Sequence, residues 1–136
     1  MKKIIVTIGL FISSSIMADP AYLLFGGNNH EKFLGCLNCN SFDSNSVWNE
    51  FGKYGSEFYS DSIWNEFGIY GSEFSSESPW NEFSTNGPII VDNSGNYYGK
   101  FTINEFDNQT RLEFPLWILK NYEYVRENLN EIRQKL

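Results

Sequence analysis

Apolar positions recur at three different spacings along the chain, and each spacing predicts a different kind of element. In residues 36–87 aromatic residues alternate with Gly, Ser and Asn, which favours turns and short extended pieces over helix. In residues 88–104 two runs of β-branched and aromatic residues, 89–91 and 97–103, flank the turn-rich stretch 92–96 and predict a β-hairpin. From residue 115 onward, apolar residues follow steps of three and four, which predicts an amphipathic helix over residues 115–136.

The predicted helix has one apolar stripe, formed by Ile118, Tyr122, Val125, Leu129, Ile132 and Leu136. Pro115 suits its first turn, and Asn121 is a candidate break into two helices. We expect the stripe to pack on the hairpin or to cap the open end of the segment before it. A dimeric coiled coil is the alternative, although three heptads are few for one.

The segment 36–87 is an internal repeat with a period of sixteen residues. Trp48, Trp64 and Trp80 each begin the sequence Trp-Asn-Glu-Phe, and the first two copies continue to Tyr-Gly-Ser-Glu-Phe. A fixed period predicts similar units that stack, here as a small β-solenoid or a coil-rich stack. Because aliphatic residues are scarce in this segment, we expect the Trp and Phe rings to point inward and form its core. The predicted fold class is therefore α+β: a stacked repeat, a β-hairpin and a C-terminal helix.

Stacking would place equivalent glutamates in rows. Glu50, Glu66 and Glu82 would form one row, and Glu57 and Glu73 another, with neighbours about 4.8 Å apart. Like charges at that separation are unfavourable unless they are solvated or bridged by a cation. We expect a solvated outer face; calcium is the alternative, because oxygen-rich clusters suit it. The chain has no spaced Asp-x-Asp-x-Asp loop, and we expect no metal and no cofactor.

Residues 1–18 have the layout of a secretory signal peptide. Lys2 and Lys3 precede an apolar core at residues 4–12, and a small-residue exit ends at Ala18. This core is shorter than the roughly 20 apolar residues of a membrane-spanning helix, and a retained N-terminal anchor is the alternative. Cleavage would leave residues 19–136 as one small domain, periplasmic or secreted, and no later stretch predicts a membrane span.

The acidic charge balance excludes one class of partner. The formal charge of the whole chain is −7, and removal of the two signal lysines makes it −9, with eight Lys or Arg against seventeen Asp or Glu. Such a chain repels phosphate backbones, and it has no basic patch to offset the repulsion. Nucleic acid is therefore not an expected partner, and anionic membrane surfaces are disfavoured for the same reason.

Cys36 and Cys39 form the one recognisable reactive pair. A Cys-x-x-Cys outside the cytoplasm can be a local disulfide, a thiol-disulfide exchange centre or half of a metal site. No thioredoxin-like βαβ pattern surrounds the pair, and His30 is the only histidine, too few ligands for structural zinc. We expect a structural disulfide or paired thiols. Lipidation at Cys36 is not expected, because a polar, charged stretch separates it from the apolar core of the signal.

The repeated aromatic residues also admit a binding role. Tyr54 and Tyr70 are flanked by glycines, so we expect them to be better exposed than the tryptophans and to be candidates for stacking on sugar rings. His30 lies in a polar loop, and no nucleophile, base and acid set accompanies it. We identify no catalytic residues and expect a protein that is not an enzyme.

The sequence resembles a group of short secreted bacterial proteins. The resemblance rests on the box Leu-Gly-Cys-Leu-Asn-Cys at residues 34–39, the Trp-Asn-Glu-Phe-Gly-x-Tyr-Gly-Ser units, and residues 88–104, and it covers about residues 22–104. Proteins of this group carry such a box followed by Trp-Asn-x-Phe/Tyr-Gly-x-Tyr-Gly-Ser repeats. The resemblance implies an exported bacterial module and transfers no catalytic residue.

Together these features predict an exported, non-enzymatic binding or structural module. Its partner would be an unknown protein or glycan of the cell envelope. One alternative is an extracytoplasmic thiol-disulfide protein that uses Cys36 and Cys39. Another is an acidic inhibitor of a basic exported enzyme, whose binding would weaken with salt.

Overall fold

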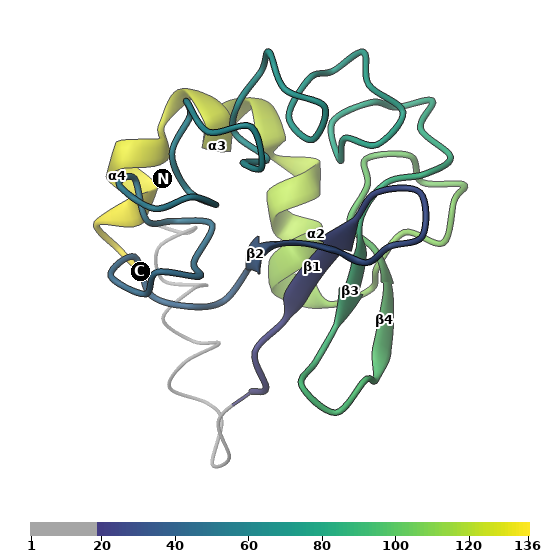
Figure 1. Cartoon of the computed structure of the whole chain (residues 1–136), viewed down its shortest axis with the longest axis horizontal. Coiled ribbons are helices and arrows are strands. Elements are labelled where there is room, and N and C mark those ends of the chain that lie inside the picture. The colour runs from purple at the N-terminus through teal and green to yellow at the C-terminus, as the bar shows by residue number, and fades with distance from the viewer. Residues whose placement is uncertain (1–18) are drawn as a thin grey trace.

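The computed structural model describes residues 19–136, so the predicted signal peptide lies outside the described residues. The described chain mixes α and β structure, as predicted: a four-stranded antiparallel sheet precedes three short helices (Figure 1). The strands are β1 (Leu23–Gly26), β2 (Lys32–Cys36), β3 (Ile89–Val91) and β4 (Tyr97–Lys100), and their order in the sheet is β2-β1-β3-β4.

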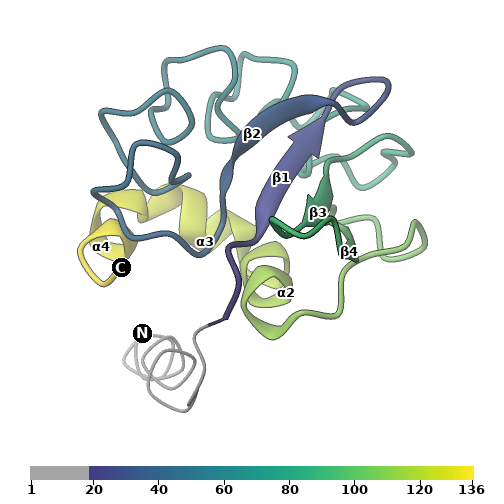
Figure 2. The same ribbon diagram turned by 60° about the horizontal axis from the view of Figure 1, so that its bottom comes forward.

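The sheet joins two hairpins that are far apart in the sequence. The β3–β4 hairpin lies within the range predicted for it, although β4 ends at Lys100 instead of continuing to Ile103. The β1–β2 hairpin was not predicted, and β1 pairs with both β2 and β3. Residues 37–88 therefore leave the sheet after β2 and return to it at β3, as the blue to green trace shows in Figure 2.

The predicted C-terminal helix is divided into three. The helices are α2 (Glu113–Lys120), α3 (Tyr122–Glu127) and α4 (Leu129–Arg133). A break at Asn121 was anticipated, and a second one occurs at Asn128. At each break the Asn side chain donates to a carbonyl one turn back: Asn121 Nδ2 to Trp117 O at 2.8 Å, and Asn128 Nδ2 to Tyr124 O at 2.9 Å. These local bonds compete with a regular helix, yet Ile118, Val125, Leu129 and Ile132 of the predicted stripe are all buried.

The repeat segment, residues 36–87, forms consecutive turns. Hydrogen bonds from the N–H of one residue to the carbonyl three residues earlier recur along it, for example Asn65 to Ser62 at 3.2 Å and Gly68 to Asn65 at 3.0 Å. The Ser or Asn that begins a turn also accepts from the N–H two residues later, as Ser62 Oγ does from Trp64 at 3.1 Å. These are the side-chain turns that Ser and Asn favour. No strand is assigned between residues 37 and 88.

The three repeat tryptophans form the centre of the core, as predicted. Trp48, Trp64 and Trp80 are at most 3% exposed, and the ring centroids of Trp64 and Trp80 lie 5.5 Å apart in a stacked arrangement. Each indole N–H donates to a carbonyl of the preceding segment; Trp80 Nε1 to Ile63 O, at 2.6 Å, is typical. Tyr122 of α3 stacks on Trp80, with centroids 5.6 Å apart. The helices thus cover the tryptophan side of the repeat segment.

The phenylalanines of the repeat do not point inward, and that prediction was wrong. Phe51, Phe58, Phe67, Phe74 and Phe83 are 80–93% exposed. The core positions that we expected the phenylalanines to fill are occupied instead by aliphatic residues from outside the repeat. These are chiefly Leu24 and Leu34 from the sheet and Ile118 from α2. The core is therefore shared between the sheet, the tryptophans and the helices.

Candidate functional site

Among residues 19–136, seven phenylalanines expose most of their surface, and we call them the phenylalanine surface. Its members are Phe42, Phe51, Phe58, Phe67, Phe74, Phe83 and Phe106, and each is 80–95% exposed. A single exposed apolar side chain is ordinary, but repeated large ones mark interaction sites. Phe106 lies outside the predicted repeat, in the sequence Asn104-Glu105-Phe106, which matches the Asn-Glu-Phe of the repeat.

The repeat contains turns of an inward and of an outward type. Inward turns carry an apolar residue followed by Trp, as in Ile63-Trp64, and both side chains are buried. Outward turns carry Glu followed by Phe, as in Glu66-Phe67, and both side chains are exposed. The two central residues of such a turn point to the same side. Because a charged Glu must remain solvated, the neighbouring Phe also points outward. A Glu precedes six of these seven Phe residues, and Phe42 follows Ser41 instead; this Glu is the sequence signal that would have predicted the orientation.

The outward turns are held rigidly. Asn65 Oδ1 accepts from the Phe67 N–H at 3.0 Å, and Asn65 Nδ2 donates to Tyr59 O at 3.1 Å. The equivalent bonds recur at Asn49 and Asn81. Because these backbones are fixed before any partner arrives, little additional ordering is needed on binding. The phenyl rings are therefore presented as a preorganised surface.

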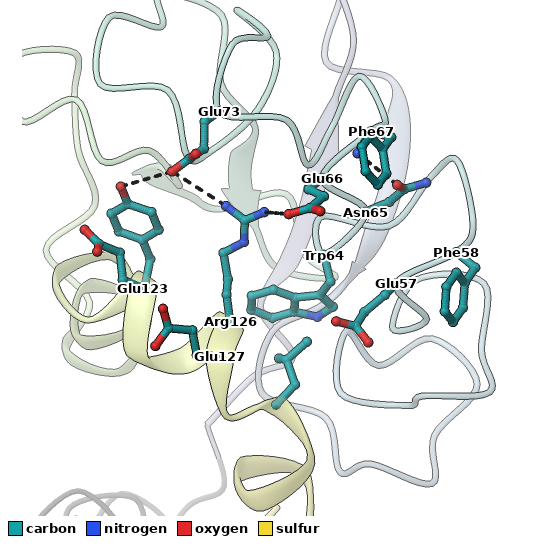
Figure 3. Close-up of a pocket in the computed structure, with 12 residues that line it drawn as sticks. Glu57, Phe58, Trp64, Asn65, Glu66, Phe67, Glu73, Glu123, Arg126 and Glu127 are labelled. Carbon is teal, nitrogen blue, oxygen red and sulfur yellow. Dashed lines mark hydrogen bonds and ion pairs between the residues drawn. The ribbon is translucent and has the colours of Figure 1, made fainter.

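A groove of about 800 Å³ lies between the outward turns and helix α3 (Figure 3). Such a volume is typical of ligand sites. Its lining comes from the turns and the helices: Glu57, Phe58, Trp64, Asn65, Glu66, Phe67, Glu73, Tyr122, Glu123, Arg126, Glu127 and Leu129. Figure 3 shows the Phe58 and Phe67 rings on the side of the groove away from α3. The groove thus combines two members of the phenylalanine surface with five carboxylates and one guanidinium.

Arg126 is the only basic residue in the groove lining. Its guanidinium lies 3.8 Å from Glu66 and 3.9 Å from Glu73, and 6.0 Å from the centroid of the Trp80 ring. The Tyr122 hydroxyl donates to Glu73 at 3.5 Å, and burial, followed by the charge of Glu73, raises the pKa of Tyr122. The phenol therefore stays protonated at neutral pH and can act as a donor. The positive charge of Arg126 offsets part of the electrostatic repulsion between the glutamates, which the sequence predicted to lie in rows.

The sequence-predicted stacking residues lie elsewhere. Tyr54 and Tyr70 are half-buried, and neither lines the groove. The Tyr54 ring meets Phe33 of β2 edge to face, with centroids 4.9 Å apart. Tyr70 lies against β1, so close that a Cβ at Gly26 would be 3.4 Å from its ring, and burial raises its pKa. The structure therefore uses both tyrosines to attach the repeat segment to the β1–β2 hairpin.

Cys36 and Cys39 are joined in a disulfide at the end of β2. Cys36 is fully buried, whereas Cys39 is half-buried. Asn38, between them, ties this turn to the chain before β1: its Oδ1 accepts from Tyr22 N at 2.8 Å and its Nδ2 donates to Pro20 O at 2.8 Å. The disulfide thus lies in a turn that is hydrogen-bonded to the chain before β1, and it lies outside the groove.

His30 lies in the turn between β1 and β2, with φ of 53°. Its Nε2 lies 3.1 Å from Gly87 O, so it links that turn to the end of the repeat segment.

Among residues 19–136, no group of three or more His, Cys, Asp or Glu side chains is arranged to hold a metal ion. In the same range, no helix is long and apolar enough to cross a bilayer.

Comparisons with protein-family models, with curated proteins and with solved structures gave no match.

Proposed function

We propose that the protein is an exported, non-enzymatic binding module that uses the phenylalanine surface to attach to a protein or glycan of the cell envelope. The exposure of seven phenylalanines carries this proposal. Full burial of one Phe side chain is worth about 1.5–3 kcal/mol. A partner that covers several of these rings at once therefore gains hydrophobic free energy that offsets the cost of association.

Three other features support this function. The signal-like sequence of residues 1–18 and the disulfide Cys36–Cys39 both suit an oxidising compartment outside the cytoplasm. The resemblance to short secreted bacterial proteins with the same Cys box suggests the same destination. The recurring bond from each tryptophan to the preceding segment supports a turn-built stack of sixteen-residue units, which would present the phenylalanines at regular intervals.

The test is co-sedimentation of residues 19–136 with bacterial envelope fragments and with insoluble cell-wall glycan. The variant carries Phe51→Ser, Phe67→Ser and Phe83→Ser, which removes the ring after each Trp-Asn-Glu. We expect the parent protein to sediment with at least one of the two materials and the variant to remain in the supernatant. Tyr97→Ser is the control, because Tyr97 is 53% exposed but lies on β4, away from the repeat.

Sedimentation of the variant to the same extent as the parent protein would refute the proposal, as would failure of the parent to sediment with either material. A near-ultraviolet circular dichroism spectrum that matches the parent's would show that the buried tryptophans, and so the fold, are intact in the variant. Tyr54→Ala and Tyr70→Ala test the sugar-stacking role separately on the glycan.

A further inference from the structure

We propose that the groove between the outward turns and α3 binds a cationic amphipathic segment of a partner protein, in which Lys or Arg alternates with apolar residues. This inference rests on the proposed function and names the partner chemistry of one part of the phenylalanine surface. It is carried by the combination of rings and carboxylates in one preformed groove.

The charges of the groove are unbalanced. Its lining holds five glutamates and one arginine, and within residues 19–136 no ion pair or side-chain hydrogen bond involves Glu57, Glu123 or Glu127. Glu66 and Glu73 lie 3.8 and 3.9 Å from Arg126, beyond the roughly 2.7–2.9 Å of a charge-assisted hydrogen bond. All five carboxylates can therefore accept additional N–H donors from a ligand.

Arg126 shows which cation the groove accommodates. Its guanidinium lies between two carboxylates and above the face of an indole ring, an arrangement that attracts Arg and Lys in general. Glu57 precedes Phe58 in the same turn, and Glu127 lines the groove from α3. Figure 3 shows the Glu57 carboxylate on the side of the turns and the Glu123 and Glu127 carboxylates along α3, on the other side of Arg126, so a cationic segment could contact carboxylates on both sides of the groove.

The rings require a partner that is also apolar. Phe58 and Phe67 are 90% and 91% exposed at the outer side of the groove. A small polyamine would pair with the carboxylates but leave the phenyl rings in water. A neutral glycan would cover the rings but remove the carboxylates from water without a counter-charge, which is costly. A second copy of this chain would bring further negative charge. A cationic amphipathic segment satisfies both features.

The experiment measures binding of three synthetic 14-residue peptides to residues 19–136 by isothermal titration calorimetry. The first peptide combines Leu and Lys, the second replaces Lys by Gln, and the third replaces Leu by Ser. We expect the Leu/Lys peptide to bind at least about tenfold more tightly than either of the others. Its affinity should fall as salt is raised from 50 to 300 mM, values chosen to shorten the Debye length.

Two double variants test the groove. Phe58→Ser with Phe67→Ser removes the rings, and Glu57→Gln with Glu127→Gln removes two carboxylates that no ion pair in residues 19–136 engages. Each is expected to raise the Kd of the Leu/Lys peptide about tenfold or more. Glu105→Gln with Tyr97→Ser is the matched control: it removes one carboxylate and one exposed ring outside both the groove lining and the phenylalanine surface, and Tyr97 is 53% exposed. It should change the Kd less than about twofold.

Equal affinity for the Ser/Lys peptide would overturn the proposal, because it would show nonspecific attraction between opposite charges. An equal loss in the Glu105→Gln, Tyr97→Ser control, or no binding of the Leu/Lys peptide, would also overturn it. The envelope assay distinguishes a wrong partner chemistry for the groove from a wrong proposed function. If the three-phenylalanine variant loses envelope binding while no peptide binds the groove, the binding function stands and only the partner chemistry is wrong.

Discussion

Two glycines of the repeat lie where no larger residue fits. A Cβ atom at Gly55 would be 2.1 Å from the carbonyl oxygen of Asn49, and one at Gly71 would be 2.1 Å from that of Asn65. Real Cβ atoms do not approach a backbone atom so closely, so the backbone would have to move. The same Asn residues hold the outward turns of Phe51 and Phe67, and each glycine is therefore required for the presentation of the phenylalanine that precedes it.

We expect Gly71→Ala to lower the free energy of unfolding by about 1–3 kcal/mol, because the inserted methyl group forces a backbone shift. Urea denaturation followed by tryptophan fluorescence measures this change. Gly68→Ala is the control in the same turn, since its Cβ would be no closer than 3.4 Å to any atom, an ordinary contact. If both variants lose the same free energy of unfolding, the loss is caused by a general change in backbone flexibility and not by the close approach at Gly71.

At the scale of elements, the β3–β4 hairpin depends on one carboxylate. Asp92 accepts hydrogen bonds from the Ser94 N–H at 2.9 Å, from the backbone and side chain of Asn96 at 3.0 and 2.9 Å, and from the Tyr98 hydroxyl at 2.7 Å. These bonds, those of the Asn96 and Tyr98 side chains first, lower the pKa of Asp92 to about 2. The same bonds explain why residues 92–96 form a hairpin turn.

The lowered pKa of Asp92 predicts a dependence of stability on pH. Folding favours the carboxylate form, so the stabilisation is present above the ordinary pKa of 3.8 and is lost as pH falls from about 4 to about 2. In Asp92→Asn the free energy of unfolding should fall less across this window than in the parent protein. Tyr98→Phe removes one of the four donors and should give an intermediate slope. Parallel pH profiles of Asp92→Asn and the parent protein would contradict the prediction.

At the scale of the whole molecule, Arg133 connects the C-terminal end to the first copy of the repeat. Its Nη2 donates to Gly55 O at 2.6 Å, across 78 residues of sequence, and its Nη1 donates to Asn130 Oδ1 at 2.9 Å. The side chain is 8% exposed, and Glu50 lies 4.0 Å away. Burial lowers the pKa of Arg133, and the nearby Glu50 and Glu57 oppose that shift. This arginine holds α4 against the turns.

Arg133→Met keeps most of the side-chain volume but leaves the buried Gly55 carbonyl without its partner. We expect the free energy of unfolding to fall by about 1.5–3 kcal/mol, the contribution typical of a hydrogen bond to a charged group. Thermal denaturation measures the loss. Lys135→Met, at an exposed position of the same end, is the control and should change stability by less than about 0.5 kcal/mol. A stable Arg133→Met variant would show that packing alone holds α4 in place.

Local patterns predicted the elements better than the candidate site. The helix stripe, the β3–β4 hairpin and the burial of the tryptophans follow from spacing and residue type, and each is confirmed. The two breaks in the helix were only partly predicted, because an Asn can remain helical or bond the preceding turn, and the neighbouring packing decides between these states. Tyr54 and Tyr70 were expected to be exposed since glycines flank them, but the unpredicted β1–β2 hairpin covers them.

The sequence alone determined the turn-based path of residues 36–87, because the Ser, Asn and Gly that begin and close each turn act over three or four residues. It also determined that the tryptophans of this segment are buried, although aliphatic residues share the core with them. Only the tertiary structure decided which rings remain in water and which glutamates meet around one groove. Those outcomes depend on β1, on α3 and on Arg126, which approach the turns from distant parts of the chain, and local patterns contain no information about such contacts.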